Sequence, residues 1–396
     1  MAIKYIDQAD LKGKNVIARF DFNVPLDKET HEITDATRIE LALPTIRMIL
    51  EKGAKKLILM SHLGRPKGER KLEYSLEPVA TYLAEKLKED VVLTETALDS
   101  GVKTLLNVNE SKVILLENLR FHKQETENDR DFAKKLSEYA DVYVNDAFGT
   151  AHRKHASTYA INAFFKNNAY AGLLLKKEIE ALTQIVETPK APFVAIVGGA
   201  KVSDKIKIIK SLLPKVSSLL IGGAMAYPFL KAKGEEIGKS LCSDEDVALA
   251  KSILGQNTGS KIVLPIDHLG SESFDGDPLN IDSASIEESL MGLDIGPKTI
   301  TLYEEKLTGA KTVLWNGPMG LFENENYAQG TFSIAQALSK LENAFTLVGG
   351  GDSVSAVNKS GLANKMSHVS TGGGASLEFI ENGTLPGINA LRFGIE

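Results

Sequence analysis

The segment FVAIVGGAKVSDKIKIIKSLLPKVSSLLIGGAM spans residues 193–225 and contains two apolar runs, each of which ends in a pair of glycines. The run FVAIVGG (193–199) is followed by apolar residues at helical spacing over 206–213, and then by SLLIGG (218–223). Near-continuous apolar strands that alternate with helices are typical of a parallel sheet that is covered on both faces. This segment therefore predicts a strand–helix–strand unit of an α/β fold.

The same alternation continues on both sides of this segment. Further runs rich in aliphatic and β-branched residues occur in both halves of the chain: VIARFDF (16–22), KLILMSH (56–62), VILLEN (113–118), VYVNDAF (142–148), IVLPID (262–267), TVLWNGP (312–318), FTLVGGG (345–351) and HVSTGGG (368–374). Amphipathic segments such as ATYLAEKLKE (80–89) and FAKKLSEYA (132–140) lie between them. The sequence thus predicts an α/β fold in which mostly parallel sheets carry helices on both faces.

A chain of 396 residues is longer than one hydrophobic core usually supports, so we expect two domains. The boundary is expected in AYAGLLLKKEIEALTQIVETPKAP (169–192), where apolar residues recur at helical spacing and two prolines follow. We predict a linking helix at about 171–187. The first domain would then comprise residues 1–170 with the C-terminal segment 380–396, and the second would comprise 171–379.

The composition argues against several classes of protein. With 43% hydrophobic and 25% charged residues, the chain is typical of an ordinary globular protein. Its net charge of −6 speaks against general nucleic-acid or membrane binding. Cys242 is the only cysteine, so no internal disulfide can form and a reducing compartment is expected. Because the first residues show no apolar signal segment and no run reaches the ~18 apolar residues of a membrane span, we expect a cytoplasmic location.

The ends of the apolar runs in the first half carry charged and amide side chains. In open α/β sheets, ligands bind beyond the carboxyl ends of the strands. The residues at these places are Asp21, Asn23, His62, Arg65, Arg120, His122, His152, Arg153 and His155. Guanidinium groups bind phosphate and carboxylate through two parallel hydrogen bonds. We therefore predict a site for a small, multiply charged anion.

Two other interpretations of these residues remain open. Any single arginine is more often a solvent-exposed surface residue than a ligand contact, although three arginines just past strand ends favour a site. His152 and His155 could instead bind a metal ion, but no nearby cysteine or glutamate completes a usual ligand spacing. Anion binding is the interpretation that we favour.

The runs of the second half end in glycine instead: GGAKVSDK (198–205), GGAM (222–225), NGP (316–318), GGGD (349–352) and TGGG (371–374). Glycine lets the backbone approach a ligand closely and adopt a positive φ. Where such a turn opens a helix, free N–H groups and the helix dipole favour phosphate oxygens. A single glycine-rich turn is often explained by tight packing, but several in one domain predict a polyphosphate ligand, and hence a nucleotide.

Individual side chains support a nucleotide site. Lys201 and Lys205 lie four residues apart at the expected start of a helix, so both would project from one face. Lysines oppose the helix dipole at that end, which suggests an anionic partner. Asp352 could bind Mg²⁺ through one carboxylate plus phosphates, could cap the helix, or could do both. Trp315 more often packs than stacks on a base, and Glu323 by itself is an ordinary loop acid.

Two familiar nucleotide motifs are missing. The Walker pattern GxxxxGK[ST] does not occur, because GEEIGKS (234–240) has a different spacing and follows no strand. No GxGxxG follows a strand with an acid about 20 residues beyond it, which argues against an NAD-dependent dehydrogenase, the first alternative function. A solute-binding protein that closes around an anion is a second alternative, against which the lack of a signal peptide counts.

Taken together, the motifs resemble those of the phosphoglycerate kinase family of bacterial type, nearly from end to end. The similarity is carried by RFDFNVP (19–25), SHLGRP (61–66), ENLRFH (117–122), DAFGTAHRKHAS (146–157), GGAKVSDKI (198–206), IGGAM (221–225), MGLDIGP (291–297), LWNGPMGLFE (314–323), GGGDS (349–353) and STGGGASLE (370–378). The resemblance implies two Rossmann-like domains joined by a hinge, a monomer, and reversible phosphoryl transfer in glycolysis. Since the two substrates would lie on different domains, the reacting oxygens meet only when the domains close.

The resemblance also implies roles for single residues. The residues that would hold 3-phosphoglycerate or 1,3-bisphosphoglycerate are Asp21, Asn23, Arg38, His62, Arg65, Arg120 and Arg153. Those that would hold ATP or ADP are Lys205, Gly292, Glu323, Gly350, Gly351, Asp352 and Ser353, with Glu323 on the ribose and Asp352 on Mg²⁺. Those that would meet the transferred phosphoryl group as catalytic residues are Arg38, Lys201 and the backbone N–H groups around Gly372–Gly374, Gly374 among them.

The chain departs from the family in small ways. LDKETHEIT (26–34) is slightly longer than usual, and Pro228 stands where a hydroxyl residue is common. The pair TR (37–38) nevertheless opens an apolar helix, which supports the assignment of Arg38. The nucleophile that the family reaction requires is a carboxylate, which is already ionised near neutral pH. No general base is therefore needed, in agreement with a site of Arg, Lys, Gly and an Asp–Mg²⁺ pair.

Overall fold

The protein is described by a computed structural model that covers residues 2–98, 100–108 and 110–395. Its chain divides into two compact units. The first unit consists of Met1–Glu180 and Thr384–Glu396, and the second of Ala181–Gly383. Within the described ranges, no helix combines the length and the apolar character that a membrane span requires.

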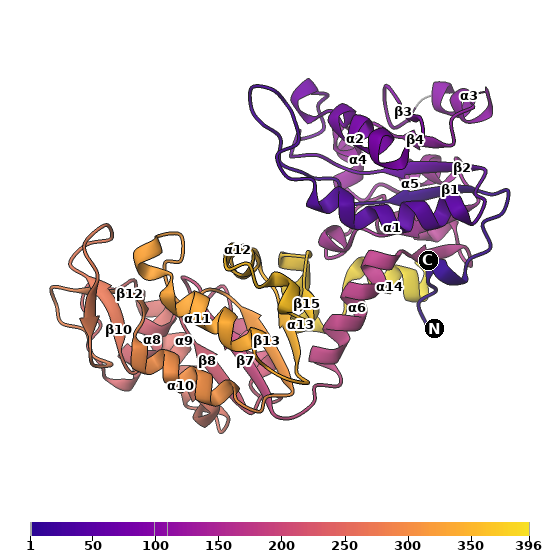
Figure 1. Ribbon diagram of the computed structural model, residues 1–396. Helices are drawn as coiled ribbons and strands as arrows, with labels where there is room; N and C mark the ends of the chain where they lie inside the picture. The colour runs from indigo at the N-terminus through magenta and orange to yellow at the C-terminus, as the bar shows by residue number, and fades with distance from the viewer. Residues whose placement is uncertain (1, 99, 109, 396) are drawn as a thin grey trace. The chain divides into compact units, whose positions relative to one another are not determined.

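The first unit is built on a parallel sheet of six strands in the order β3-β4-β2-β1-β5-β6 (Figure 1). The strands are β1 (Asn15–Arg19), β2 (Lys56–Met60), β3 (Val91–Leu93), β4 (Val113–Leu115), β5 (Val142–Asn145) and β6 (Ala169–Ala171). The α-helices are α1 (Thr37–Glu51), α2 (Glu77–Leu87), α3 (Ser100–Val108), α4 (Lys123–Thr126), α5 (Arg130–Ser137) and α14 (Pro386–Phe393). The 3₁₀ turns are η1 (Ile6–Gln8), η2 (Leu72–Tyr74), η3 (Leu119–Phe121), η4 (Phe148–Thr150) and η5 (Ala160–Phe164).

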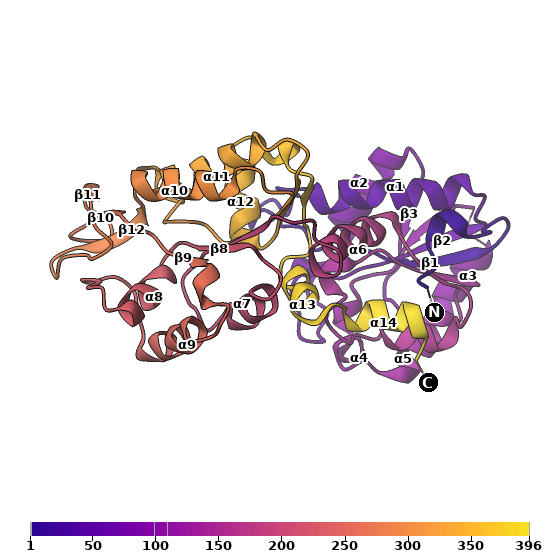
Figure 2. The same cartoon turned by 90° about the horizontal axis from the view of Figure 1, so that it is seen from below.

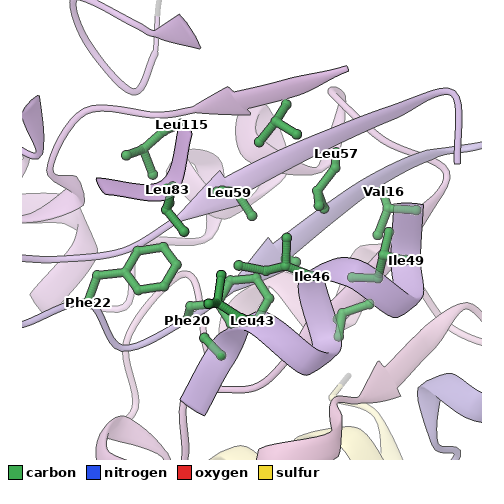
Figure 3. Packing of buried hydrophobic residues seen from close by; sticks show 14 of the residues in the cluster. Val16, Phe20, Phe22, Leu43, Ile46, Ile49, Leu57, Leu59, Leu83 and Leu115 are labelled. Carbon is green, nitrogen blue, oxygen red and sulfur yellow. The ribbon is translucent and has the colours of Figure 1, made fainter. Parts of the chain in front are cut away.

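Alternate residues of these strands form the core beneath α1 and α2. Val16, Leu57 and Leu59 face Ile46 and Ile49 of α1 in one buried cluster (Figure 3). Side chains alternate between the two faces of a strand, so the intervening residues point to the opposite face. That face carries α4, α5 and α14 (Figure 2). Because both faces are covered, every residue of β2 is buried and the strand reads as a continuous apolar run.

The second unit contains a second parallel sheet, in the order β15-β14-β13-β7-β8-β9, and a separate antiparallel sheet, β11-β10-β12. The strands are β7 (Phe193–Val197), β8 (Ser218–Ile221), β9 (Ile262–Val263), β10 (His268–Ser271), β11 (Leu279–Ile281), β12 (Met291–Ile295), β13 (Thr312–Asn316), β14 (Phe345–Val348) and β15 (His368–Val369). The α-helices are α7 (Ile206–Leu212), α8 (Ala226–Lys233), α9 (Asp244–Leu254), α10 (Pro297–Leu307), α11 (Gln329–Ser339), α12 (Gly351–Lys359) and α13 (Gly374–Asn382). The 3₁₀ turns are η6 (Gly259–Lys261), η7 (Glu325–Tyr327) and η8 (Ala363–Lys365).

Helices cover both faces of the second parallel sheet as well. Helices α10, α11 and α12 lie on one face, and α7, α8, α9 and α13 lie on the other (Figure 2). Trp315 is completely buried in the core beneath α10–α12 and donates from Nε1 to the carbonyl of Gly317 at 2.8 Å. The prediction that this tryptophan packs rather than stacks on a base is therefore confirmed.

The predicted fold class of two mostly parallel α/β sheets is confirmed. Each quoted apolar run contains a strand, and most of these strands end before the polar or glycine residues of the run, whereas β5 and β13 extend to Asn145 and Asn316. The predicted linking helix is α6 (Leu173–Val186), which begins in the first unit and ends in the second. The sequence analysis missed β3, β6 and the antiparallel sheet.

One local prediction is wrong. Lys201 and Lys205 do not share a helical face, because α7 begins only at Ile206 and Lys205 is its N-cap residue. The loop before the helix is held from elsewhere, since the carboxylate of Asp246 accepts a hydrogen bond from the backbone N–H of Ser203 at 2.8 Å. That hydrogen bond joins residues 43 positions apart. It engages the N–H of Ser203 with a side chain outside the segment, in place of a helical turn over 201–205.

Candidate active site

The anion-site residues of the first unit lie at one edge of its sheet. Strands β1, β2, β4 and β5 are parallel neighbours, so their carboxyl ends meet at the same edge. The predicted residues that follow these ends are Asp21 and Asn23 after β1, His62 and Arg65 after β2, Arg120 in η3 after β4, and Arg153 after β5. Arg38 comes from the first turn of α1.

Hydrogen bonds connect several of these side chains to one another or to a shared turn. The guanidinium of Arg38 donates from Nη1 to Oδ2 of Asp21 at 3.0 Å. The side-chain oxygen of Asn23 accepts from the N–H of Gly64 at 2.8 Å, and Arg120 donates from Nη1 to the carbonyl of Gly64, also at 2.8 Å. The turn after β2 therefore links the end of β1 to η3.

The two outermost arginines contact fewer groups. Arg153 is exposed and donates from Nε to Nε2 of His152 at 3.1 Å. Arg65 is exposed, and its guanidinium makes no hydrogen bond or ion pair within the described ranges. The structure thus places Arg65 beside the cluster without joining it to the other predicted residues. Both side chains remain free to meet an anion from solvent.

Burial and positive charge control protonation in this unit. His62 is 3% exposed, and burial followed by the charges of Arg19, Arg120 and Arg38 holds its pKa well below the usual value. Burial and the charge of Arg19 also lower the pKa of Arg120, to about 10. At neutral pH the site therefore contains charged arginines and a neutral histidine.

In the second unit, two helices present their first turns at glycines. Gly350 caps α12 with φ 89°, and Gly373 caps α13 with φ 52°. Side chains are rarely tolerated at such φ values, and a Cβ on Gly350 would lie 2.6 Å from Nδ2 of Asn316. The first N–H groups of a helix have no partner within it, so both turns offer donors to phosphate oxygens. Gly351, Asp352 and Gly374 are exposed at these turns.

The hydroxyl of Ser353 faces the interior of the second unit. Ser353 is completely buried in the first turn of α12, and its Oγ accepts from the N–H of Gly317 at 2.5 Å. The hydroxyl therefore connects α12 to the loop after β13. Its backbone N–H, rather than its hydroxyl, is the group that can serve a phosphate.

The side chain of Lys205 is oriented by Asn316, which was not among the residues predicted from the sequence. Its Nζ donates to Oδ1 of Asn316, and Nδ2 of Asn316 donates to the carbonyl of Gly349 at 2.7 Å. Burial lowers the pKa of Lys205, while the carboxylate of Asp352 opposes that shift. Asn316 is the first residue of the quoted NGP segment (316–318). The sequence could therefore have indicated it, but only the glycine of that segment was interpreted. Lys201 is exposed in the loop before α7.

A cavity of about 310 Å³ opens beside these elements and is lined mainly by apolar atoms. Of the predicted nucleotide residues, Gly292, Glu323 and Asp352 line it. A Cβ on Gly292 would lie 2.2 Å from the hydroxyl of Tyr227, which also lines the cavity. The cavity has the size and character of a site for a flat heterocycle. Lys201, Lys205, the helix-start glycines and Ser353 lie outside its lining.

The metal expected with a nucleotide can be tested against the side chains present. Among the described residues, no three His, Cys, Asp or Glu side chains gather as a metal site. Mg²⁺ is commonly held by one or two carboxylates together with substrate phosphates and waters. Asp352, exposed in the first turn of α12 and at the rim of the cavity, fits that arrangement.

Comparisons with known proteins identify the family. A family model described as "Phosphoglycerate kinase" matches residues 6–383. The phosphoglycerate kinase of Anaeromyxobacter sp. (strain Fw109-5) is 53% identical over 399 residues, which cover 99% of this chain and 100% of the relative. That of Clostridium novyi (strain NT) is 50% identical, with 98% of each chain covered. The solved structure of phosphoglycerate kinase from Coxiella burnetii has a TM-score of 0.89 at 39% identity, with 99% of each chain covered. The chain belongs to the phosphoglycerate kinase family.

Proposed function

We propose that the chain transfers a phosphoryl group reversibly between 1,3-bisphosphoglycerate and ADP on one side and 3-phosphoglycerate and ATP on the other. The observation that carries this function is the similarity of about 50% identity to phosphoglycerate kinases over essentially the whole chain. The chain is therefore a phosphotransferase that acts in glycolysis. A dehydrogenase has no support, because the family is a kinase family.

The first unit holds the acid in this proposal. The residues that form this site are Asp21, Asn23, Arg38, His62, Arg65, Arg120 and Arg153. Arginine suits this ligand because its planar fork matches both the phosphate and the carboxylate. Asp21 accepts from Arg38, so its carboxylate orients a guanidinium rather than meeting the anion directly.

The second unit holds the nucleotide. The base and ribose enter the 310 Å³ cavity past Gly292, with Glu323 on the ribose. The phosphates then meet Lys205 and the first turn of α12, where Gly350, Gly351 and Ser353 supply backbone groups. Asp352 would hold Mg²⁺, which neutralises phosphate charge and orients the phosphoryl group when it is bound.

Transfer needs positioning and charge neutralisation more than acid–base chemistry. The attacking group is an ionised carboxylate, so no residue has to remove a proton. Three groups stabilise the charge on the phosphoryl oxygens during transfer: Arg38, Lys201 and the N–H of Gly374. Each of these residues is partly or fully exposed. A cytoplasmic location and a monomeric state stay predictions of the sequence analysis.

An ATP-consumption assay with 3-phosphoglycerate, coupled to reduction of the acyl phosphate, tests this function. We expect turnover that requires the acid, ATP and Mg²⁺ together. Matched reactions with glycerate, which lacks the phosphate, separate this activity from a less specific acid kinase. Equal rates with the two acids, or no turnover at saturating ligands, would overturn the proposal.

A further inference from the structure

A buried arginine lies directly behind the acid site and contacts one of its residues. Arg19, the last residue of β1, is completely buried. Its Nε donates to Oγ of Ser157 at 2.9 Å, its Nη1 donates to the carbonyl of Phe20, and its Nη2 lies 3.1 Å from Nδ1 of His62. Each guanidinium nitrogen thus has a partner, and the partner in the acid site is a histidine ring.

The contact with His62 decides which ring nitrogen carries the proton. A guanidinium can donate but never accept a hydrogen bond. At 3.1 Å, Nδ1 of His62 must therefore accept, so it is unprotonated and the single ring proton lies on Nε2. No hydrogen bond within the described ranges uses Nε2, which leaves that N–H available to an oxygen of a ligand.

The surrounding charges act in the same direction. Arg19, Arg38, Arg120 and His155 all oppose a positive charge on His62. Among the described residues, Asp21 is the one carboxylate that pairs with the ring, and its Oδ1 lies 3.9 Å from Nδ1, which is too long for a hydrogen bond. A protonated ring would have to turn away from Arg19 toward Asp21.

A buried carboxylate holds Arg19 in place through an intermediate hydroxyl. Ser157 donates from Oγ to Oε1 of Glu125 at 2.6 Å and from its N–H to Oε2 at 3.0 Å. Glu125 is completely buried, and no carboxylate of the described chain pairs with Arg19 directly. Because Ser157 gives its proton to Glu125, its lone pair faces the Nε–H of Arg19. The buried charges are thus balanced through one defined chain of hydrogen bonds.

We propose that Arg19 and Glu125 are positioning residues that fix His62 as a neutral hydrogen-bond donor, with its proton on Nε2, for an oxygen of the bound acid. The role of His62 toward the acid rests on the proposed function, whereas the state of its ring is a property of the ligand-free protein. His62 then adds direction to the arginine cluster without adding another positive charge to it.

The state of the ring can be read by long-range ¹H–¹⁵N NMR of the full chain labelled at its seven histidines. His62 is assigned from the signals that disappear in His62→Gln. We expect an unprotonated Nδ1 and a protonated Nε2, unchanged between about pH 5 and 8, the range in which an ordinary histidine titrates. A protonated Nδ1, or titration in this range, would overturn the proposal.

Substitutions test which residues fix the protonation state of the His62 ring. Arg19→Met removes the donor and keeps the apolar stem, and Glu125→Gln keeps the shape but replaces one acceptor oxygen with a donor. We expect both variants to lose the single His62 state and to raise KM for 3-phosphoglycerate by roughly tenfold, with KM for ATP unchanged. Arg47→Met is the matched control, since Arg47 lies exposed on α1 and binds only the carbonyl of Lys86 in the described chain.

The outcomes separate the two claims. If Arg19→Met does not fold, Glu125→Gln carries the test, because its side chain has nearly the same volume. An unchanged His62 spectrum in the folded variants would overturn the positioning role. If the ring state changes but KM for the acid does not, His62 does not contact the acid. That result would overturn both this part of the proposed function and the proposal that the ring serves the acid.

Discussion

The two units present opposite chemistries at the ends of similar sheets. In the first unit, charged side chains lie after the strands, as Arg120 does, or in the first turn of α1, as Arg38 does, and they are oriented by the carbonyl of Gly64 and by Asp21. In the second unit, glycines follow the strands, and backbone N–H groups at α12 and α13 are the exposed donors. The same α/β framework thus builds one site from side chains and the other from the main chain.

The two kinds of site should respond differently to substitution. A guanidinium site depends on a few terminal atoms, so a truncation removes the function and leaves the backbone in place. A glycine site depends on the path of the chain, so an added Cβ disturbs it even though no donor is lost.

The largest effect is expected from truncation of the catalytic cations. Arg38→Ala and Lys201→Ala should each lower kcat by about a hundredfold or more, because one well-placed donor to a charged transition state is worth roughly 3–4 kcal/mol. The side chain of Arg38 is 42% exposed and Lys201 is also exposed, so the fold should survive. Steady-state kinetics measures the effect.

Matched controls for these variants lie close by. Arg47→Ala and Lys210→Ala remove the same charge from exposed positions, the first on the helix that contains Arg38 and the second on the helix that follows Lys201. We expect both controls to keep the kcat of the unchanged protein. A control that loses as much activity as its partner would mean that general charge, rather than position, supports transfer.

The next effect concerns a buried carboxylate in the second unit. Asp294 is 2% exposed and accepts from the N–H groups of Gly330 and Ile295, while burial raises its pKa from 3.8 to about 7. Between these values the folded state holds a proton that the unfolded state has released. Stability from this group therefore rises as the pH falls from about 7 toward 4 and is lost as the pH rises again.

Urea unfolding at pH 5 and pH 7, followed by the fluorescence of Trp315, measures this dependence in the second unit. Each pKa unit corresponds to about 1.4 kcal/mol, so Asp294→Asn should change the difference between the two pH values by at most about 3 kcal/mol. The variant should lose the gain that the unchanged protein shows at pH 5. Equal pH dependence in both proteins would mean that Asp294 does not titrate in this window.

A smaller effect is expected from Gly292→Ala. The added Cβ would lie 2.2 Å from the hydroxyl of Tyr227, so it should narrow the cavity and raise KM for ATP by roughly tenfold, the scale of overpacking in a closed site. KM for 3-phosphoglycerate should stay constant. Gly255→Ala is the control, since its Cβ would meet only an ordinary contact at 3.4 Å. A change confined to the acid would contradict the assignment of the two ligands.

The smallest effect is expected from salt. Arg65, Arg153 and Arg38 lie in or near solvent, where ions screen charges over about 10 Å at 0.1 M. Raising NaCl from about 0.05 to 0.3 M should weaken binding of 3-phosphoglycerate by roughly threefold, as measured by calorimetry. Binding of adenosine, which has no charge, serves as the control and should not change. A stronger salt effect on adenosine would argue against an apolar cavity for the base.

The sequence predicted the parallel sheets, and which residues share one sheet edge, because both depend on local patterns. Apolar runs mark buried strands, and residues that follow parallel strands share one edge, so Asp21, His62 and Arg120 could be brought together without coordinates. Strands β10 and β11 were missed because HLGS and LNI are short and carry no clear alternation.

The remaining errors come from contacts between distant parts of the chain. The start of α7 depends on Asp246, and the burial of Arg19 depends on Ser157, which lies 138 positions away. Asn316 reaches Lys205 across 111 positions. No periodicity within a window of the sequence reports such pairs, although the polar residues themselves stood inside or beside the quoted motifs.

We propose that side chains hold the acid and main-chain turns hold the triphosphate. A crystal structure of the protein with Mg²⁺ and a non-hydrolysable ATP analogue would show where the triphosphate binds. We expect phosphate density at the N–H groups of Gly351 and Asp352, beside Lys205, with the base in the cavity next to Gly292. Triphosphate density among Arg65, Arg120 and Arg153 would contradict the proposal.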